Sequence, residues 1–148
     1  MLRIGKLADY GLLIADCLAG APDQLTTEAI VQQTGLPDAT VRKLLRHLVD
    51  AGLVSSRRGL KGGYRLSRTA DRISVAELIA AIEGPIGLTE CTHDDDHCTL
   101  SPGCGMRGNW HVITDLINRQ LATITLADMA GDLNHRGASR IALTALAN

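Results

Sequence analysis

Three of the four cysteines in this chain of 148 residues lie close together, and their spacing points to metal chemistry. Six residues separate Cys91 from Cys98, and five separate Cys98 from Cys104. Thiolates are soft ligands that select zinc, copper(I) or iron–sulfur clusters. The short Cys-x2–4-Cys pairing of structural zinc sites is absent. The wider spacing therefore favours an iron–sulfur cluster, of the 2Fe–2S or 4Fe–4S type.

Other uses of the same cysteines stay open. His93 and His97 lie between Cys91 and Cys98 and keep a zinc-binding module as an alternative. A thiol-redox protein or a cluster carrier would use the same three thiols. No Cys-x-x-Cys motif, Ser–His–Asp arrangement or carboxylate pair points to catalysis, so we do not expect an enzyme. Three cysteines leave a cluster one protein ligand short, and an incompletely ligated iron is labile, which suits a sensor.

The residues before this thiol segment predict three helices followed by a hairpin. Helices are expected over residues 7–19, over 28–33 and from Asp38 to about residue 50. The third helix has an apolar stripe at helical spacing, formed by Val41, Leu44, Leu45 and Leu48. Residues 53–57 and 63–67 are short strand candidates joined by a glycine-rich turn. This is the order of a winged helix-turn-helix, whose third helix enters the major groove of DNA.

The second half of the chain predicts two further helices around a polar loop. Ser74 and Glu77 form a capping box that opens a helix ending at Gly84-Pro85. Residues 88–108 are polar and have no period, and residues 125–130 add one more turn. Residues 109–122 predict a long helix with an apolar stripe of Trp110, Ile113, Ile117 and Leu121. The expected fold class is mainly α: a winged helix-turn-helix with a two-stranded wing, a cysteine-rich loop and a long C-terminal helix.

The charge distribution favours double-stranded DNA as the partner. The net charge is −1, but residues 42–72 hold nine basic and two acidic side chains, a local balance of +7. Such asymmetry indicates a polyanion-binding face. A winged helix that binds only protein is the alternative, although it would not need this concentration of basic side chains. The predicted DNA contacts are Thr40, Arg42, Lys43 and Arg46 on the third helix and Arg57, Arg58, Gly59 and Lys61 on the wing.

A cytoplasmic protein is the default expectation from the composition. Apolar residues make up 45% of the chain, which excludes a disordered protein. No run of about 18 apolar residues is present, so we expect no membrane span. The apolar N-terminal stretch lacks a basic leader and is interpreted as a helix of the fold, not as a signal peptide.

Cys17 lies apart from the other cysteines and is expected to be a small core residue. Tyr64 is expected to pack the wing onto the helices.

With these elements in place, the chain resembles the IscR/NsrR/RirA family of iron–sulfur transcription regulators over about residues 1–130. The resemblance rests on residues 1–10, MLRIGKLADY, on the wing at 52–64, GLVSSRRGLKGGY, and on LTEC at 88–91. The chain is most similar to the branch that regulates SUF-type iron–sulfur cluster assembly. That branch shares the runs GPIGLTEC at 84–91 and RGNW at 107–110.

The resemblance implies a homodimer in which the long C-terminal helix packs against the partner, and a cluster held by Cys91, Cys98 and Cys104. Members of the IscR type have a histidine ligand after the third cysteine, where this chain has Arg107, which stays protonated and cannot ligate iron. Nitric-oxide-sensing members recruit an acidic residue from the first helix of the other subunit, and Asp9 matches that position. An ordinary surface carboxylate is the alternative for Asp9.

The resemblance also implies how the chain is divided and what it does. We expect a DNA-binding domain over residues 1–84, a cluster loop and dimerisation helix over 85–130, and a mobile or weakly helical tail over 131–148. The expected function is a cluster-dependent repressor of SUF-type assembly genes that senses cluster or redox status and binds a pseudo-palindromic operator. A nitric-oxide-responsive or iron-responsive repressor of the same family is the alternative.

Overall fold

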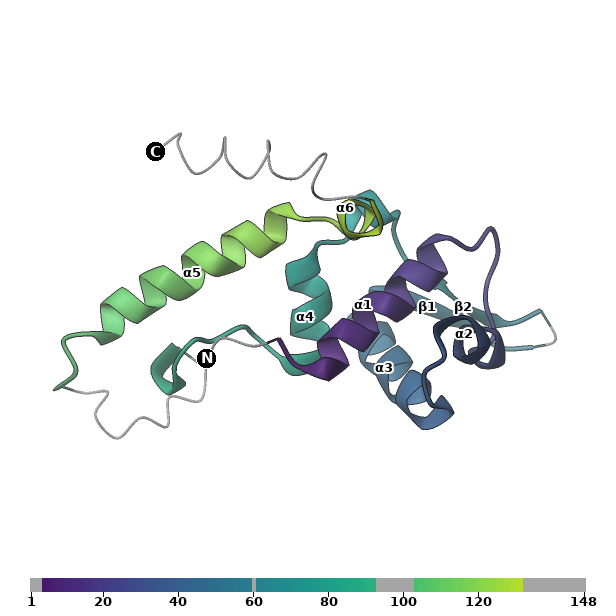
Figure 1. Cartoon of the computed structure of the whole chain (residues 1–148), viewed down its shortest axis with the longest axis horizontal. Coiled ribbons are helices and arrows are strands. Elements are labelled where there is room, and N and C mark those ends of the chain that lie inside the picture. Colours follow the sequence, from purple (N-terminus) through teal and green to yellow (C-terminus); the bar gives the residue numbers. More distant parts are fainter. Residues whose placement is uncertain (1–3, 60, 93–102, 132–148) are drawn as a thin grey trace.

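The computed structural model describes residues 4–59, 61–92 and 103–131. Within these residues the chain is helical apart from one antiparallel hairpin (Figure 1). The α-helices are α1 (Lys6–Ala19), α2 (Thr27–Thr34), α3 (Asp38–Asp50), α4 (Val75–Glu83), α5 (Arg107–Thr123) and α6 (Leu126–Ala130). The strands are β1 (Val54–Arg57) and β2 (Gly63–Leu66), and the 3-10 turns are η1 (Ala70–Arg72) and η2 (Glu90–Thr92). The predicted mainly α fold with a two-stranded wing is confirmed.

The first four α-helices pack around a core of leucine, isoleucine and valine side chains. The stripe predicted for the third helix is confirmed, because its four residues are fully buried in α3: Val41, Leu44, Leu45 and Leu48. Residues at this spacing lie on one side of a helix, so their burial turns the other side of α3 outward. Ile14 of α1 and Ile30 of α2 are fully buried in the same cluster.

Local signals set the ends of α2 and α3. The Thr26 hydroxyl accepts a hydrogen bond of 3.3 Å from the Ala29 N–H, and so caps the start of α2. Gly35 ends α2 at φ +69°, and Gly52 follows α3 at φ +72°, in the left-handed region that favours glycine. These two glycines turn the chain between α2 and α3 and then from α3 into β1.

The wing is docked onto the helices at its base. β1 and β2 pair from Val54 with Leu66 to Arg57 with Gly63. Leu25 and Tyr64 exchange two backbone hydrogen bonds, of 2.9 and 2.8 Å, which join the segment before α2 to β2. A Cβ on Gly63 would lie 2.6 Å from the Leu25 carbonyl oxygen, so this close approach requires glycine. Tyr64 packs against the core, as predicted.

A capping box opens α4, as predicted. The Glu77 N–H donates to the Ser74 hydroxyl at 3.2 Å, and the Ser74 N–H donates to the Glu77 carboxylate at 2.9 Å. Thr125 and Asp128 form a second capping box at the start of α6. The two reciprocal bonds satisfy N–H groups that a helix start otherwise leaves without partners.

The segment after α5 returns the chain to the main core. The Val75 N–H donates to the Ile124 carbonyl, and the Leu126 N–H donates to the Ile73 carbonyl, both at 2.8 Å. Leu126 is 1% exposed and belongs to the same cluster as the residues of α1, α2 and α3. The C-terminal end of α5 is therefore held against the start of α4. The proposed division of the chain at residue 84 stays a prediction.

The face of α5 that packs on its own chain differs from the predicted stripe. Trp110 and Ile113 are 36% and 40% exposed, whereas Thr114 is buried. Asn118 donates a side-chain hydrogen bond of 3.2 Å to the Ile86 carbonyl, and Leu121 packs against the small cluster at α4. The N-terminal half of α5 extends away from the helical body (Figure 1). Helical periodicity finds an apolar stripe but does not say which surface covers it, and the exposed Trp110 and Ile113 leave the expected packing against a partner as a prediction.

Several predictions fall outside the described residues. These are the positions of Cys98, His93 and His97 and the order of the tail from residue 132 onward. In the described part of the chain, no helix combines the length and the apolar character that crossing a membrane requires.

The capping box makes Glu77 a source of pH-dependent stability. The pKa of Glu77 is lowered first by the Ser74 N–H and then by the Arg68 guanidinium, 2.8 Å away. A carboxylate with a lowered folded-state pKa stabilises the fold above its unfolded pKa, about 4.3, and this stabilisation is lost as pH falls through the folded value. Glu77→Gln keeps the cap hydrogen bonds and removes the charge. We expect it to lower the free energy of unfolding at neutral pH by less than about 1 kcal/mol, because the pair is partly exposed.

Urea denaturation at neutral and at acidic pH measures this difference. Asp71→Asn removes the same charge from an exposed side chain of η1 and is the matched control, with little effect expected at either pH. If Glu77→Gln lowers the free energy of unfolding by the same amount at both pH values, the charge of Glu77 is not the cause of the loss.

Candidate nucleic-acid interface and thiol segment

The outward face of α3 is basic. Arg42, Lys43 and Arg46 are exposed and Thr40 is half-buried, within about two turns of one helix. The buried leucine stripe occupies the opposite side of α3, so the packing of the core determines which side chains reach solvent. The structure thus places the four helix residues that the sequence predicts as DNA contacts on or beside one exposed face.

Arg42 is held by two carboxylates on this face. Its Nε donates to Asp38 Oδ2 at 2.7 Å, and an Nη lies 3.5 Å from Glu28 Oε1. The hydrogen bond to Asp38 is the largest cause that raises the pKa of Arg42. All three side chains are more than half exposed, so the pairs contribute little to stability. Their consequence is for binding, because the two carboxylates occupy the Nε and one Nη donor of Arg42 and offset its positive charge on this face.

The pairing of Arg42 with these two carboxylates was not predicted from the sequence, for two different reasons. Asp38 precedes Arg42 by four residues in the same helix, a spacing typical of ion pairs, and this signal was available. Glu28 lies fourteen residues away in α2, and only the packing of α2 against α3 brings it to Arg42.

The wing tip is a tight turn with exposed basic side chains. Arg57, Arg58, Gly59 and Lys61 are all exposed. Gly59 has φ +112°, and its carbonyl accepts a 2.8 Å hydrogen bond from the Gly62 N–H. A Cβ on Gly62 would clash with the Arg57 carbonyl, so the turn requires glycine there. In Figure 1 the wing extends to the right of the body, on the side where α2 and α3 lie.

Two of the three predicted ligand thiols lie in the described residues. Cys91 is buried in η2, which packs against α5, and its Sγ lies 3.2 Å from the Thr89 hydroxyl. Cys104 is exposed just before α5, and both cysteines are free thiols. Within the ranges that the structure describes, no three His, Cys, Asp or Glu side chains gather as a metal site. The structure therefore leaves the complete set of Cys91, Cys98 and Cys104 untested.

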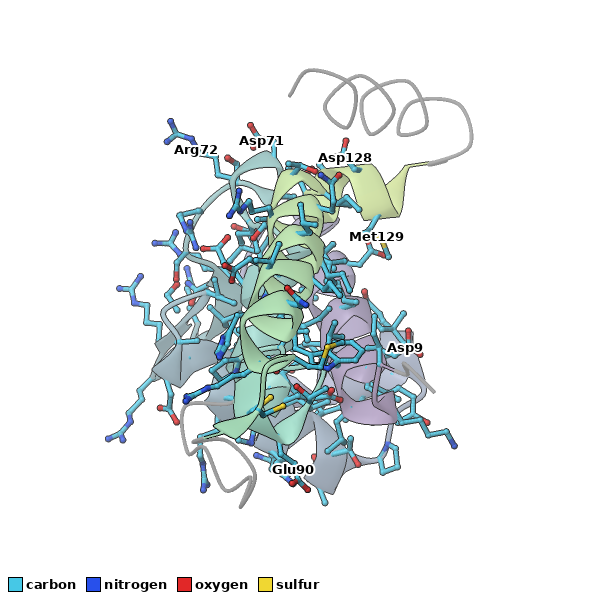
Figure 2. All side chains as sticks on the ribbon, turned by 90° about the vertical axis from the view of Figure 1, so that its left-hand side faces the viewer. Asp9, Asp71, Arg72, Glu90, Asp128 and Met129 are labelled. Carbon is cyan, nitrogen blue, oxygen red and sulfur yellow. The ribbon has the colours of Figure 1, made fainter. Side chains whose placement is uncertain are left out.

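Asp9 lies apart from the thiol segment of its own chain. It is exposed on α1, near the start of that helix. Figure 2 shows Asp9 to one side on α1 and Glu90, the neighbour of Cys91, at the bottom of the same view. Within the described residues, Asp9 is not part of a group of three potential metal ligands, and its predicted role as a ligand from the other subunit stays a prediction.

Cys17 differs from the other thiols. It packs partly buried against the core, as predicted, and its Sγ donates to Gln33 Oε1 at 3.2 Å. Burial and the neighbouring Asp16 raise the pKa of this thiol. A thiol that resists ionisation is a poor metal ligand, which is consistent with a structural role.

α5 and the turn before it carry an uncovered apolar surface, defined here as the α5 apolar face: Met106, Trp110, Val112, Ile113 and Leu116. Each of these side chains is between 36% and 59% exposed. Large apolar side chains that gather on one exposed surface mark a site of protein contact. Leu7 and Leu13 of α1 are also exposed large apolar residues.

Comparison with known proteins gives a consistent result. The family model Rrf2, described as an iron-dependent transcriptional regulator, matches residues 4–132. The rrf2 protein of Nitratidesulfovibrio vulgaris is 30% identical over 133 residues, which cover 88% of this chain and 89% of the relative. The transcriptional regulator IscR of Photobacterium profundum is 34% identical over 105 residues, which cover 71% of this chain and 60% of the relative.

A solved structure agrees with these sequence matches. CymR of B. subtilis, the global cysteine regulator, has a TM-score of 0.67 and 31% sequence identity with this chain. The match covers 88% of this chain and 97% of CymR. The arrangement of helices and wing described above is therefore also found in a solved transcriptional regulator.

The pairing of Arg42 predicts that Asp38 weakens binding to DNA. Asp38→Asn removes a negative charge from the face and releases Arg42 from its 2.7 Å partner. We expect affinity for DNA to rise by roughly threefold to tenfold at low salt, with a steeper dependence on salt concentration because one more cation contacts phosphate. Titration of labelled DNA by fluorescence anisotropy at several salt concentrations measures both quantities.

Asp50→Asn is the matched control, because it removes the same charge from the other end of α3. It should change affinity less than Asp38→Asn. Equal effects of the two variants, or weaker binding by Asp38→Asn, would contradict the view that Asp38 withholds Arg42 from DNA.

Proposed function

The chain belongs to the Rrf2 family of transcriptional regulators, and from this we propose that it is an iron–sulfur-cluster-dependent repressor that binds DNA as a homodimer. Regulators of this family bind DNA and are not enzymes. The finer parts of the proposal are the residues that contact DNA, the cluster, the dimer and the genes that are controlled. A protein that acts on chromosomal DNA works in the cytoplasm, so we also propose that location.

The basic surface of α3 and the wing is the single observation that carries the DNA contacts. Lys43 and Arg46 on α3 and Arg57, Arg58 and Lys61 on the wing have no ion-pair partner among the described residues. Side chains at the start of α3 would contact base edges in the major groove, where arginine and lysine donate to guanine. The wing tip would contact the phosphate backbone or the adjacent minor groove. The operator would be pseudo-palindromic, since a two-fold dimer presents two copies of α3.

The donor chemistry of the thiol segment fits an iron–sulfur cluster. Cys91 and Cys104 are free thiols, and thiolates are the ligands that such clusters prefer. Cys91, Cys98 and Cys104 would supply three ligands, and Asp9 of a second copy would supply the fourth. A bound cluster, 2Fe–2S or 4Fe–4S, would provide the redox chemistry of the sensor. Similarity to IscR of Photobacterium profundum supports this assignment.

The homodimer would form through the α5 apolar face. In the described part of the chain, no other element covers this surface. Burial of the exposed parts of these apolar side chains on both copies is favourable and would offset part of the entropy that association costs. The N-terminal end of α5, beside Cys104, would then lie near the partner. This arrangement would bring the thiol segment of one copy toward α1 of the other.

The genes for SUF-type cluster assembly are the proposed targets. The runs GPIGLTEC and RGNW support this branch of the family. A nitric-oxide-responsive or iron-responsive repressor is an alternative that uses the same residues. A cysteine-responsive regulator without a cluster is the second candidate, and the similarity to the global cysteine regulator of B. subtilis favours it.

Purification without oxygen tests the cluster directly. We expect a brown protein with equal amounts of iron and sulfide, and a visible spectrum that identifies the cluster type. Cys98→Ala and Cys104→Ala should each lose the colour and the response of DNA affinity to iron. Cys17→Ala is the matched control, since Cys17 lies in the core away from the thiol segment, and it should keep both.

Three outcomes separate the alternatives. A colourless protein that contains one zinc per chain would indicate a zinc site in place of the cluster. Colourless, metal-free protein whose DNA affinity changes with cysteine would favour the cysteine-responsive candidate. If iron changes the DNA affinity of neither the Cys98→Ala variant nor the unchanged chain, the sensing mechanism is refuted.

Substitutions that introduce negative charge on the α5 apolar face test the proposed dimer. Val112 and Leu116 are 59% and 53% exposed, so replacing them with Asp leaves the core of the chain intact. We expect the double variant V112D/L116D to sediment as a monomer and to bind a two-half-site operator at least about tenfold more weakly. His111→Asp, on the other side of α5, is the control and should remain a dimer. A double variant that stays dimeric would place the interface elsewhere.

A further inference from the structure

Among the described residues, one buried side-chain oxygen has no hydrogen-bond partner: the hydroxyl of Thr114 in α5. Thr114 is 5% exposed, and solvent does not reach this oxygen. Other helical threonines of the chain behave differently, since the hydroxyls of Thr34 and Thr123 each donate to a backbone carbonyl of the preceding turn at 2.7 Å. A buried donor without a partner destabilises the fold. The Thr114 hydroxyl therefore needs an acceptor that the described residues do not supply.

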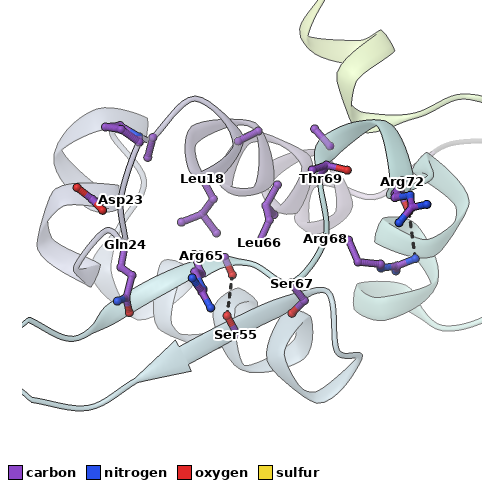
Figure 3. Close-up of a pocket in the computed structure, with 14 residues that line it drawn as sticks. Leu18, Asp23, Gln24, Ser55, Arg65, Leu66, Ser67, Arg68, Thr69 and Arg72 are labelled. Atoms are coloured by element: carbon purple, nitrogen blue, oxygen red, sulfur yellow. Dashed lines mark hydrogen bonds between the residues drawn. The ribbon is translucent and has the colours of Figure 1, made fainter.

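The pocket at the base of the wing, with a cavity volume of about 820 Å³, contains no such group (Figure 3). Figure 3 shows Arg65 and Arg72 at opposite ends of the pocket with Arg68 between them, so its guanidinium groups do not converge on one point. The Ser55 hydroxyl and the Arg68 guanidinium already donate to backbone carbonyls, at 3.5 and 3.0 Å. The unsatisfied polar group of the described chain thus lies on α5 and not in this cavity.

Thr114 lies at the contact between α5 and η2. These two elements pack against each other, and each has a single buried residue, Cys91 in η2 and Thr114 in α5. Asn118, one turn after Thr114 on the same side of α5, donates to the Ile86 carbonyl in the segment that leads to η2. α4 packs farther along α5, at Leu121. The side of α5 that carries Thr114 therefore covers the turn that carries Cys91.

The sulfur of Cys91 is held in a fixed turn and can accept a further hydrogen bond. The Thr92 hydroxyl donates to the Thr89 carbonyl at 2.8 Å and accepts from the Thr89 N–H at 3.1 Å, which closes the turn around Cys91. Cys91 Sγ lies 3.2 Å from the Thr89 hydroxyl. A neutral thiol is a weak acceptor, whereas a metal-bound thiolate carries negative charge and accepts charge-assisted hydrogen bonds. The free thiol thus leaves the Thr114 hydroxyl unsatisfied, and a thiolate would satisfy it.

We propose that the Thr114 hydroxyl donates a hydrogen bond to the Cys91 sulfur when Cys91 is a metal-bound thiolate, an inference that rests on the proposed cluster. Thr114 is then a positioning residue, because it acts through Cys91. Hydrogen bonds to the ligand sulfurs help to set the reduction potential of iron–sulfur clusters, and such outer partners strengthen metal binding. Since the bond stabilises negative charge on sulfur, it raises the reduction potential and slows the loss of iron. It also connects the thiol segment to α5, the helix of the proposed dimer interface.

Thr114→Val tests this bond, because valine has nearly the shape of threonine and lacks the hydroxyl. In the full-length chain purified without oxygen, we expect a lower reduction potential and roughly fivefold faster loss of iron to a chelator, both followed in the visible spectrum. Thr114→Ser keeps the hydroxyl and should retain the values of the unchanged chain. Thr123→Val is the matched control, since it removes an exposed hydroxyl from the other end of α5, and it should change neither quantity. An unchanged potential in Thr114→Val would overturn the proposal.

The metal-free chain should respond to the same substitution with the opposite sign. Without a thiolate to accept from it, the Thr114 hydroxyl is a buried, unpaired donor, so Thr114→Val should raise the urea concentration at the midpoint of unfolding. Thr123→Val should lower this midpoint or leave it unchanged. If Thr114→Val destabilises the metal-free and the cluster-bound chain alike, Thr114 has a structural role only and the proposal fails.

The cluster proposal and the Thr114 proposal can fail separately. A colourless protein after purification without oxygen refutes the cluster and says nothing against the hydrogen bond. Cobalt(II) then serves as the probe, because its thiolate absorption band moves when a hydrogen bond to the sulfur is removed. Thr114→Val should shift this band to longer wavelength, whereas Thr114→Ser and Thr123→Val should leave it in place. A band that Thr114→Val does not shift would show that Thr114 does not donate to Cys91.

Discussion

The burial of the leucine stripe of α3 is the constraint on which the rest of the structure depends. Each fully buried aliphatic side chain stabilises the fold by about 1.5 to 3 kcal/mol, and four of them fix the rotation of α3 about its axis. The exposed ion pairs on the other side contribute at most about 1 kcal/mol each. The core therefore decides which side chains face DNA, and the charges on that face change without reorienting the helix.

The return of the chain to the core at Leu126 gives α5 one fixed end. Two backbone hydrogen bonds of 2.8 Å and the buried Leu126 side chain hold its C-terminal end at the start of α4. α5 has 17 residues and is about 25 Å long, and its other end begins beside Cys104. A change at the thiol segment thus acts far from the fixed end and far from α3 of the same chain. In the proposed dimer, such a change would alter how two copies are arranged more than the shape of either copy.

The sequence predicted those features that local chemistry determines. The stripe of α3, the capping box at Ser74, the glycine after α3 and the two-stranded wing follow from spacing and from residue types within a few positions. The pairing of Glu28 with Arg42, the burial of Thr114 and the return of Leu126 to the core depend on which elements meet in space. Periodicity gives an apolar face of α5, but only the packed chain shows that part of this face stays uncovered. The roles of the DNA-contact and cluster residues rest on residue type and resemblance, so they remain predictions.

The fold also reduces the excess of positive charge that is available for DNA binding. Residues 42–72 hold an excess of seven positive charges, but Asp38, Glu28 and Glu77 from outside this stretch pair with Arg42 and Arg68. These three carboxylates reduce the local excess from seven to four. What remains uncompensated is concentrated on the wing, its base and the middle of α3. Non-specific affinity grows with the number of phosphates neutralised, so the paired carboxylates limit attraction to any DNA. The start of α3 then contributes less to this non-specific attraction than its basic side chains suggest, because Asp38 and Glu28 already pair with Arg42.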